Sequence, residues 1–264
     1  MTNKTTFTLR QIALAATVFT ALACAALPAS QVFAGTSDWL GGGERVQGNG
    51  KIQKQTRALG HFTGVSLNLP ATTELRIGNT ESITIEADEN ILPMIEAVIE
   101  DGSLKIRPIK RNLSLQTRNM KIVVQAKDVN RIALGGSGSI DSDALRGSKL
   151  QFDLGGSGSI KVKGIEGDAV SVTLGGSGDF STVGGKAGTV SISIGGSGDV
   201  DLGRVRASAA SVSVAGSGEA IVWPKDSLSV TVAGSGDVSY YGDPKVSKTV
   251  VGSGGTRRLG DAPQ

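Results

Sequence analysis

The stretch Ser171–Phe180 has the sequence SVTLGGSGDF, and twenty residues later Ser191–Val200 has SISIGGSGDV. The Gly-Ser-Gly triplet inside both stretches occurs seven times, with its first glycine at 136, 156, 176, 196, 216, 234 and 252. The interval is 20 residues four times and then 18 residues twice. A repeat of this length is typical of stacked solenoid units and has to be interpreted before any single motif.

Apolar and polar residues alternate just before each triplet. The apolar positions are Ile132 and Leu134, Phe152 and Leu154, Val172 and Leu174, Ile192 and Ile194, Val212 and Val214, and Val230 and Val232. A second apolar series follows the triplets at Ile140, Ile160, Phe180, Val200, Ala220 and Val238. A period of two predicts strands with one buried face and one face in water.

Equivalent positions carry the same residue type in every repeat, so parallel stacking brings like residues together. The sequence therefore predicts an all-β fold, a right-handed parallel β-helix of ~20-residue coils spaced by about 4.8 Å. The Gly-Ser-Gly triplet is predicted to form the corner, because glycine has no Cβ to clash there. The serines at 137, 157, 177, 197, 217, 235 and 253 should form a ladder whose hydroxyls bond the turn amides.

Other interpretations of the glycine-rich motif fail on spacing. A dinucleotide loop needs a third glycine and a helix, but Gly136-Ser137-Gly138 is followed by Ser139-Ile140-Asp141 in a strand pattern. The sequence contains no Gly-Lys-Ser/Thr Walker motif. The calcium nonapeptide needs an acid at its sixth position, where Ile140 and its equivalents stand.

The N-terminus has the features of a secretory signal peptide over residues 1–34. Lys4 and Arg10 precede the apolar run 12–27, and Val32-Phe33-Ala34 offers a cleavage site after Ala34. The alternative is lipidation at Cys24, the only cysteine. Either route predicts an exported protein of the periplasm, the outer envelope or the extracellular space.

Removal of residues 1–34 takes two of the 27 basic residues and leaves 25 against 24 acidic ones, a net charge of +1. This balance argues against a nucleic-acid partner. No transmembrane segment is expected after signal removal. The remaining segments are a flexible Gly-rich leader over 35–56, N-terminal strands over 57–131, regular coils over 132–256 and a loose tail over 257–264.

The order of several short stretches resembles a known family. Phe62–Val65, Leu75–Gly78, Ile83–Asp88, Asp101–Leu104 and Gly136–Ile140 are similar to the "putative autotransporter-adhesin head" family called the GIN domain. The resemblance covers about residues 55–245. It implies an exported bacterial domain of β-helical fold in the cell envelope or at the surface, and it supplies no catalytic residues.

Two groups of residues are candidates for sites of chemistry. His61 is the only histidine, and it is interpreted as a surface residue because zinc or triad partners do not accompany it. Acidic residues follow the triplet at Asp179, Asp199, Glu219 and Asp237, so they should form one column along the stack. The column could be a solvated edge, a weak Ca²⁺ site or a catalytic pair. We expect no catalytic residues and no cofactor, with Ca²⁺ as the one candidate.

Two further clusters stand out. Basic residues gather at Lys105, Arg107, Lys110, Arg111, Arg118 and Lys121, where an anionic glycan or lipid headgroup could bind if they are not simply a solvated face. Trp223, Tyr240 and Tyr241 lie in the last coils and are predicted to cover the open end of the core.

The outward positions of the first strand in each coil carry short hydroxyl side chains. They are Ser171, Thr173, Ser191, Ser193, Ser211, Ser213, Ser229 and Thr231. Thr and Ser also suit exposed strands by propensity alone. The hypothesis is that this face binds a second copy of the protein or an extended envelope glycan. The sequence therefore favours a non-enzymatic protein with a binding, adhesion or assembly role, and the alternative is a polysaccharide lyase or hydrolase on the same fold.

Overall fold

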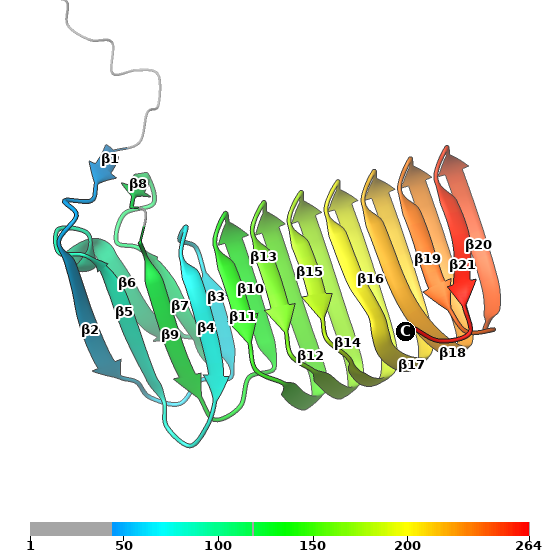
Figure 1. Ribbon diagram of the computed structural model, residues 1–264, viewed down its shortest axis with the longest axis horizontal. Coiled ribbons are helices and arrows are strands. Elements are labelled where there is room, and N and C mark those ends of the chain that lie inside the picture. Colours follow the sequence, from blue (N-terminus) through cyan, green and yellow to red (C-terminus); the bar gives the residue numbers. More distant parts are fainter. Residues whose placement is uncertain (1–43, 118, 264) are drawn as a thin grey trace, which may run out of the picture. The chain divides into compact units, whose positions relative to one another are not determined.

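The computed structural model describes residues 44–117 and 119–263. The predicted signal peptide, Cys24 and the first part of the predicted leader lie outside the described residues. Within the described part, parallel coils stack side by side along one axis, as Figure 1 shows. This confirms the predicted parallel β-helix.

The N-terminal part is built from short strands and one 3-10 turn. They are β1 (Glu44–Gln47), β2 (Ile52–Ala58), β3 (Gly64–Leu67), β4 (Thr72–Ile77), β5 (Ser82–Asp88), η1 (Leu92–Met94), β6 (Ile95–Glu100), β7 (Ser103–Pro108), β8 (Leu113–Gln116) and β9 (Lys121–Ala126). The order of these strands along the stack differs from their order in the chain. β3 pairs in parallel with both β7 and β10, so β7 joins the stack outside β3 although it follows β3 in the sequence.

The strands of the coils that follow are β10 (Arg131–Gly136), β11 (Ser139–Ser142), β12 (Leu145–Gly156), β13 (Ser159–Val162), β14 (Ile165–Gly176), β15 (Asp179–Thr182), β16 (Gly185–Gly196), β17 (Asp199–Gly216), β18 (Glu219–Gly234), β19 (Asp237–Tyr241), β20 (Lys245–Gly252) and β21 (Gly255–Gly260). Most of these coils contain a short strand and a longer one, whereas β17 and β18 each run through both parts of a coil without a break. Parallel pairing aligns Leu134 with Leu154, Leu154 with Leu174, and Leu174 with Ile194. The sequence repeat thus sets the register directly.

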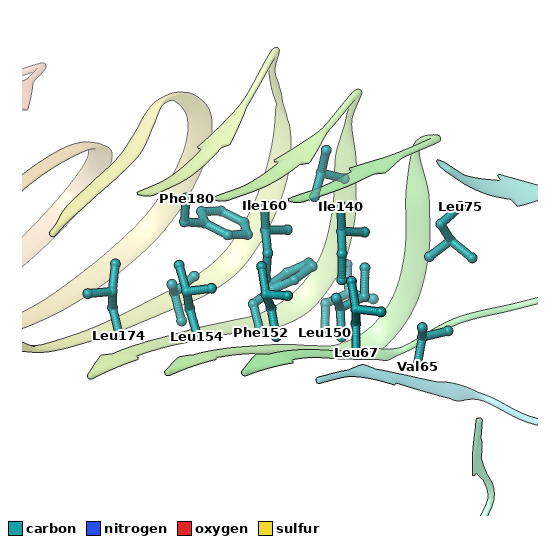
Figure 2. Close-up of a cluster of buried hydrophobic side chains, with 14 of the residues drawn as sticks. Val65, Leu67, Leu75, Ile140, Leu150, Phe152, Leu154, Ile160, Leu174 and Phe180 are labelled. Atoms are coloured by element: carbon teal, nitrogen blue, oxygen red, sulfur yellow. The ribbon is translucent and has the colours of Figure 1, made fainter. Parts of the chain in front are cut away.

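The interior is a continuous column of apolar side chains. Figure 2 shows Leu154 and Leu174 at equivalent positions, and Ile140, Ile160 and Phe180 facing them from the opposite sheet. Phe152 and Phe180 meet across the interior with ring centroids 4.8 Å apart and an interplanar angle of 50°. Such a tilted contact is favourable for aromatic pairs. Each coil depends on its neighbours to bury these side chains.

The Gly-Ser-Gly corners stack in backbone contact, as the repeat predicted. A Cβ built on Gly176 would lie 2.3 Å from the carbonyl oxygen of Gly156, which leaves space for hydrogen only. The predicted role of the serine hydroxyls differs from the observed one. The Ser177 amide donates to the Gly156 carbonyl of the preceding coil at 2.9 Å, and the other regular corners repeat this bond. Backbone carbonyls of the neighbouring coil therefore satisfy the corner amides.

Some coils have a second turn that the sequence pattern did not reveal. In the coil of β13 and β14 the chain turns at Lys163-Gly164, between the two strands. Ile165 follows this turn and is 2% exposed. A coil such as this one buries six apolar side chains, Ile160, Val162, Ile165, Val170, Val172 and Leu174.

Antiparallel strands close the N-terminal end of the stack. β6 and β7 form a hairpin whose turn residues Asp101 and Gly102 both have positive φ, 51° and 72°, as a tight hairpin turn requires. On the other sheet β5 runs antiparallel to β9 and to β2. The change from parallel to antiparallel pairing ends the coil pattern.

Both ends differ from the predicted leader and tail. Residues 35–56 were expected to be flexible, but β1 pairs with β8 and β2 pairs with β5 over its whole length. Residues 257–264 were expected to be loose, but β21 extends to Gly260 and pairs with β19. These strands lie at sheet edges with most side chains in water, so they lack the apolar alternation that marks an inner strand.

The C-terminal coil leaves part of the core in water. Its inward positions hold Val246 and Val250, 39% and 37% exposed, with Lys248 between them. The predicted aromatic cover is only partly present. Tyr240 packs against the core, while Trp223 lies under the Arg206 guanidinium at 5.7 Å. An inward lysine on an edge strand opposes pairing with another chain.

Candidate functional site

The eight predicted hydroxyl residues lie on one sheet surface formed by β14, β16, β17 and β18. We call them the hydroxyl face: Ser171, Thr173, Ser191, Ser193, Ser211, Ser213, Ser229 and Thr231. Parallel pairing aligns Ser171 with Ser191 and Thr173 with Ser193, and the same register continues to Ser229 and Thr231. Adjacent hydroxyls in a column are therefore about 4.8 Å apart.

The hydroxyl face is exposed, with only Ser171 half-buried. Its columns continue through Ser247 and Thr249 on β20, so two uncharged columns reach the last coil. Toward the N-terminal coils the two hydroxyl columns end at Gln151 and Asp153 on β12. Asp153 forms an ion pair with Arg131 at 2.8 Å. An uncharged surface of this length is unusual, because exposed strands normally carry charges that prevent association.

The acidic column exists, and part of it bonds the backbone. Asp179 aligns with Asp199, and Glu219 aligns with Asp237. The Glu219 amide donates to Asp199 Oδ1 at 3.0 Å, and the Gly255 amide donates to Asp237 Oδ1 at 2.7 Å. Two of these acids therefore serve as acceptors for the next coil. Across residues 44–117 and 119–263, no three His, Cys, Asp or Glu side chains are grouped so that they could hold a metal ion.

His61 forms a surface pair with a carboxylate. Its Nδ1 lies 2.6 Å from Glu81 Oε1, and the imidazole is 62% exposed. The hydrogen bond with His61 lowers the pKa of Glu81, and the ammonium of Lys127 contributes to the same shift. The geometry agrees with the interpretation of His61 as a surface residue.

The basic cluster is largely paired within the N-terminal strands. Arg107 donates to Glu96 and Glu100 on β6, and Lys105 donates to Glu100 at 2.8 Å. Hydrogen bonds from Lys105 and Arg107 lower the pKa of Glu100. Lys110 pairs with Glu44, Lys121 pairs with Glu74, and Arg118 lies outside the described residues. These carboxylates offset most of the positive field that an anionic ligand would need.

A buried carboxylate that the sequence did not single out secures the N-terminal segment. Asp88 is 4% exposed and accepts hydrogen bonds from the Gly50 amide and from Thr117 Oγ1, both at 2.6 Å. A Cβ on Gly48 would lie 2.2 Å from Asp88 Oδ2. Asp88 thus ties the β1–β2 connection to the segment after β8. Its position at the end of an alternating strand gave no signal of this role.

Replacement of Asp88 by Asn should lower the melting temperature, because the amide loses the charge that strengthens both hydrogen bonds. The bond from Thr117, and then that from Gly50, lowers the pKa of Asp88 from its ordinary 3.8. The ionised carboxylate therefore stabilises the fold at pH values above the ordinary pKa, and this stability is lost as the pH falls through the lowered pKa.

Thermal melts of both proteins between pH 7 and pH 2.5 check this expectation. The difference in melting temperature should be largest near neutral pH and should shrink below about pH 4. An equal difference at every pH would show that Asn acts by altered packing. Asp168→Asn, an exposed site on the same chain, is the matched control.

Comparisons with known proteins identify relatives by family and fold. A family model described as "Putative auto-transporter adhesin, head GIN domain" matches residues 61–244. No curated protein matches the chain. Across the described part of the chain, no helix has the length and hydrophobicity that a bilayer crossing requires.

Solved structures share the fold over most of their length. One, titled a putative lipid binding protein from Parabacteroides distasonis, is 25% identical with a TM-score of 0.70, covering 82% of this chain and all of the other. A putative adhesin from Bacteroides fragilis is 21% identical with a TM-score of 0.74, covering 81% of this chain and all of the other. At 21% identity, the similarity to the Bacteroides fragilis structure shows a shared fold and nothing more.

Proposed function

The chain belongs to the GIN-domain family, described as "Putative auto-transporter adhesin, head GIN domain", and from this premise we propose that it is a non-enzymatic binding protein of the bacterial cell envelope. The family and its solved relatives carry the names of adhesins and a lipid-binding protein, which supports a surface binding role. Export through the signal peptide of residues 1–34, or lipidation at Cys24, would bring the protein to that compartment.

The hydroxyl face is the observation that carries the proposal. Short side chains allow a flat partner to approach closely, and each hydroxyl can donate and accept a hydrogen bond. Stacked coils fix these groups in register before any partner arrives, which reduces the entropy lost on binding. A partner with regularly spaced hydrogen-bonding groups fits such a surface, and the two candidates are an extended envelope glycan and a second copy of this protein.

The alternative of a polysaccharide-active enzyme has weaker support. Glycoside hydrolysis needs two carboxyl groups about 5 to 9.5 Å apart, with one of them held protonated as the acid. The acids of the column are mostly exposed, and two of them accept backbone amides. The lipid-binding title of one relative would apply to a headgroup on the outside, since the interior of this chain is filled by its own side chains.

Lysine at both Ser193 and Ser213 tests the hydroxyl face. Both side chains point into water, so the melting temperature should change little. Two adjacent like charges should weaken retention on purified insoluble peptidoglycan at least about tenfold, or convert an oligomer to monomer in light scattering. The control places the same two charges elsewhere, at Ser148 and Val183, which are exposed on other surfaces.

The proposal fails if the Ser193→Lys/Ser213→Lys variant matches the wild type in both assays. It also fails if the control variant loses as much retention, because net charge would then explain the effect. Sedimentation of the protein with and without peptidoglycan, measured together with light scattering, separates the glycan from the second copy as partner.

A further inference from the structure

A groove of about 570 Å³ lies on the outside of the last coils, away from the hydroxyl face. Its lining includes Asp201, Arg204, Ile221, Tyr241, Leu259 and Asp261. The groove therefore combines an aromatic ring and aliphatic side chains with two carboxylates and a guanidinium. Its volume falls within the roughly 300 to 1,000 Å³ that is typical of small-molecule sites.

One wall of the groove is formed by the C-terminal segment, which folds back over the coils. After β21 the chain returns toward β17, as Figure 1 shows. The Gly242 amide donates to the Gly260 carbonyl at 2.8 Å, and Arg258 Nε donates to the Gly242 carbonyl at 2.6 Å. Arg258 also pairs with Asp261. These bonds hold the wall against β19.

The floor is fixed by a close approach at Gly203. A Cβ at this position would lie 2.8 Å from Ile221 Cγ2 and 3.3 Å from Tyr241 Cε2, so both side chains pack directly over the glycine backbone. The Gly203 amide also donates to Asp201 Oδ1 at 2.9 Å, which orients that carboxylate. The ring, the aliphatic side chain and the carboxylate are thus held in place before a ligand binds.

We propose that this groove binds a neutral saccharide, an inference that rests on the proposed binding function and adds a second contact to it. The apolar face of a sugar ring fits against Tyr241 and Ile221, and its hydroxyls donate to Asp201 and Asp261 and accept from Arg204. With the Asp261–Arg258 pair counted, two carboxylates and two guanidinium groups lie in and beside the groove, and this balance suits a neutral ligand. The groove and the hydroxyl face lie on different sheet surfaces, so the two sites can be tested separately.

Titration with maltose, cellobiose and N,N′-diacetylchitobiose, followed by calorimetry and ligand-observed NMR, tests the groove. At least one of these disaccharides should bind with a Kd below about 10 mM, and Tyr241→Ala should weaken it at least about tenfold. Tyr241→Phe keeps the ring and should bind within about threefold of the wild type. The Ser148→Lys/Val183→Lys variant, whose two lysines lie outside both proposed sites, should bind these disaccharides as the wild type does.

Three results would overturn the groove proposal. They are the absence of binding by all three disaccharides, equal binding by a folded Tyr241→Ala variant, and tighter binding of a sulfated disaccharide than of its neutral parent. A melting curve of Tyr241→Ala confirms that the variant is folded. If peptidoglycan retention depends on Ser193 and Ser213 while any of these three results is found, the proposed function stands and the groove assignment falls.

Discussion

Leu174→Asp should yield no folded protein. Leu174 is 1% exposed and lies between Leu154 and Ile194 of the neighbouring coils. Loss of a buried leucine alone costs about 2 to 5 kcal/mol, and an unpaired carboxylate at the same place adds a desolvation penalty. The sum approaches the whole stability of an ordinary domain, about 5 to 15 kcal/mol.

The matched control changes the preceding residue. Thr173→Asp introduces the same group at an exposed position on the same strand, so it should remain soluble with a melting temperature near that of the wild type. Soluble yield and circular dichroism of the two variants provide the measurement. A cooperative melt of Leu174→Asp near the wild-type temperature would mean that residue 174 faces water and that the register is shifted by one.

Gly176→Ala should be strongly destabilising, because the stacked corner has no space for a methyl group. The new Cβ would lie 2.3 Å from the Gly156 carbonyl oxygen and 2.9 Å from the Gly156 nitrogen, and both contacts are with backbone. Residue 176 also has φ +153°, which side chains rarely adopt. Strain of about 3 kcal/mol would lower the melting temperature by roughly 6 to 12 °C.

The adjacent glycine supplies the control. A Cβ on Gly175 meets no atom within 4 Å, and later coils carry Ala215, Ala233 and Val251 at the equivalent position. Gly175→Ala should therefore melt within about 2 °C of the wild type. Differential scanning calorimetry compares the two variants. If both have the same melting temperature, the corners are not in backbone contact.

The repeat made the architecture predictable because each signal was local and was copied from coil to coil. The equivalents of Gly176 and Leu174 recur every 20 residues and, in the last coils, every 18, so the stacking followed from sequence position alone. The hairpin at Asp101-Gly102 was also predictable, since this dipeptide favours a tight turn. The turn before Ile165 was not, because the equivalents of Ile165 include Leu145 and Gly185, and a varied position shows no period.

The sites were harder to predict than the fold. The hydroxyl face follows from alternation, since Ser193 and Ser213 lie between inward residues in each strand. The role of Asp88 depends on hydrogen bonds with Gly50 and Thr117, which lie 38 and 29 residues away in the sequence. The groove at Tyr241 forms only because the C-terminal segment returns to the outside of the last coils. Contacts of this kind arise from the folded path of the chain, and no local pattern encodes them.

One incubation tests the central claim that this β-helix binds envelope material without cleaving it. The purified protein is mixed with peptidoglycan and with a panel of neutral polysaccharides, and both retained protein and newly released reducing ends are measured over time. The account predicts retention that is reduced by Ser193→Lys/Ser213→Lys, with no increase in reducing ends. Release of reducing ends that disappears with Asp179→Asn would contradict it and would identify an enzyme on the acidic column.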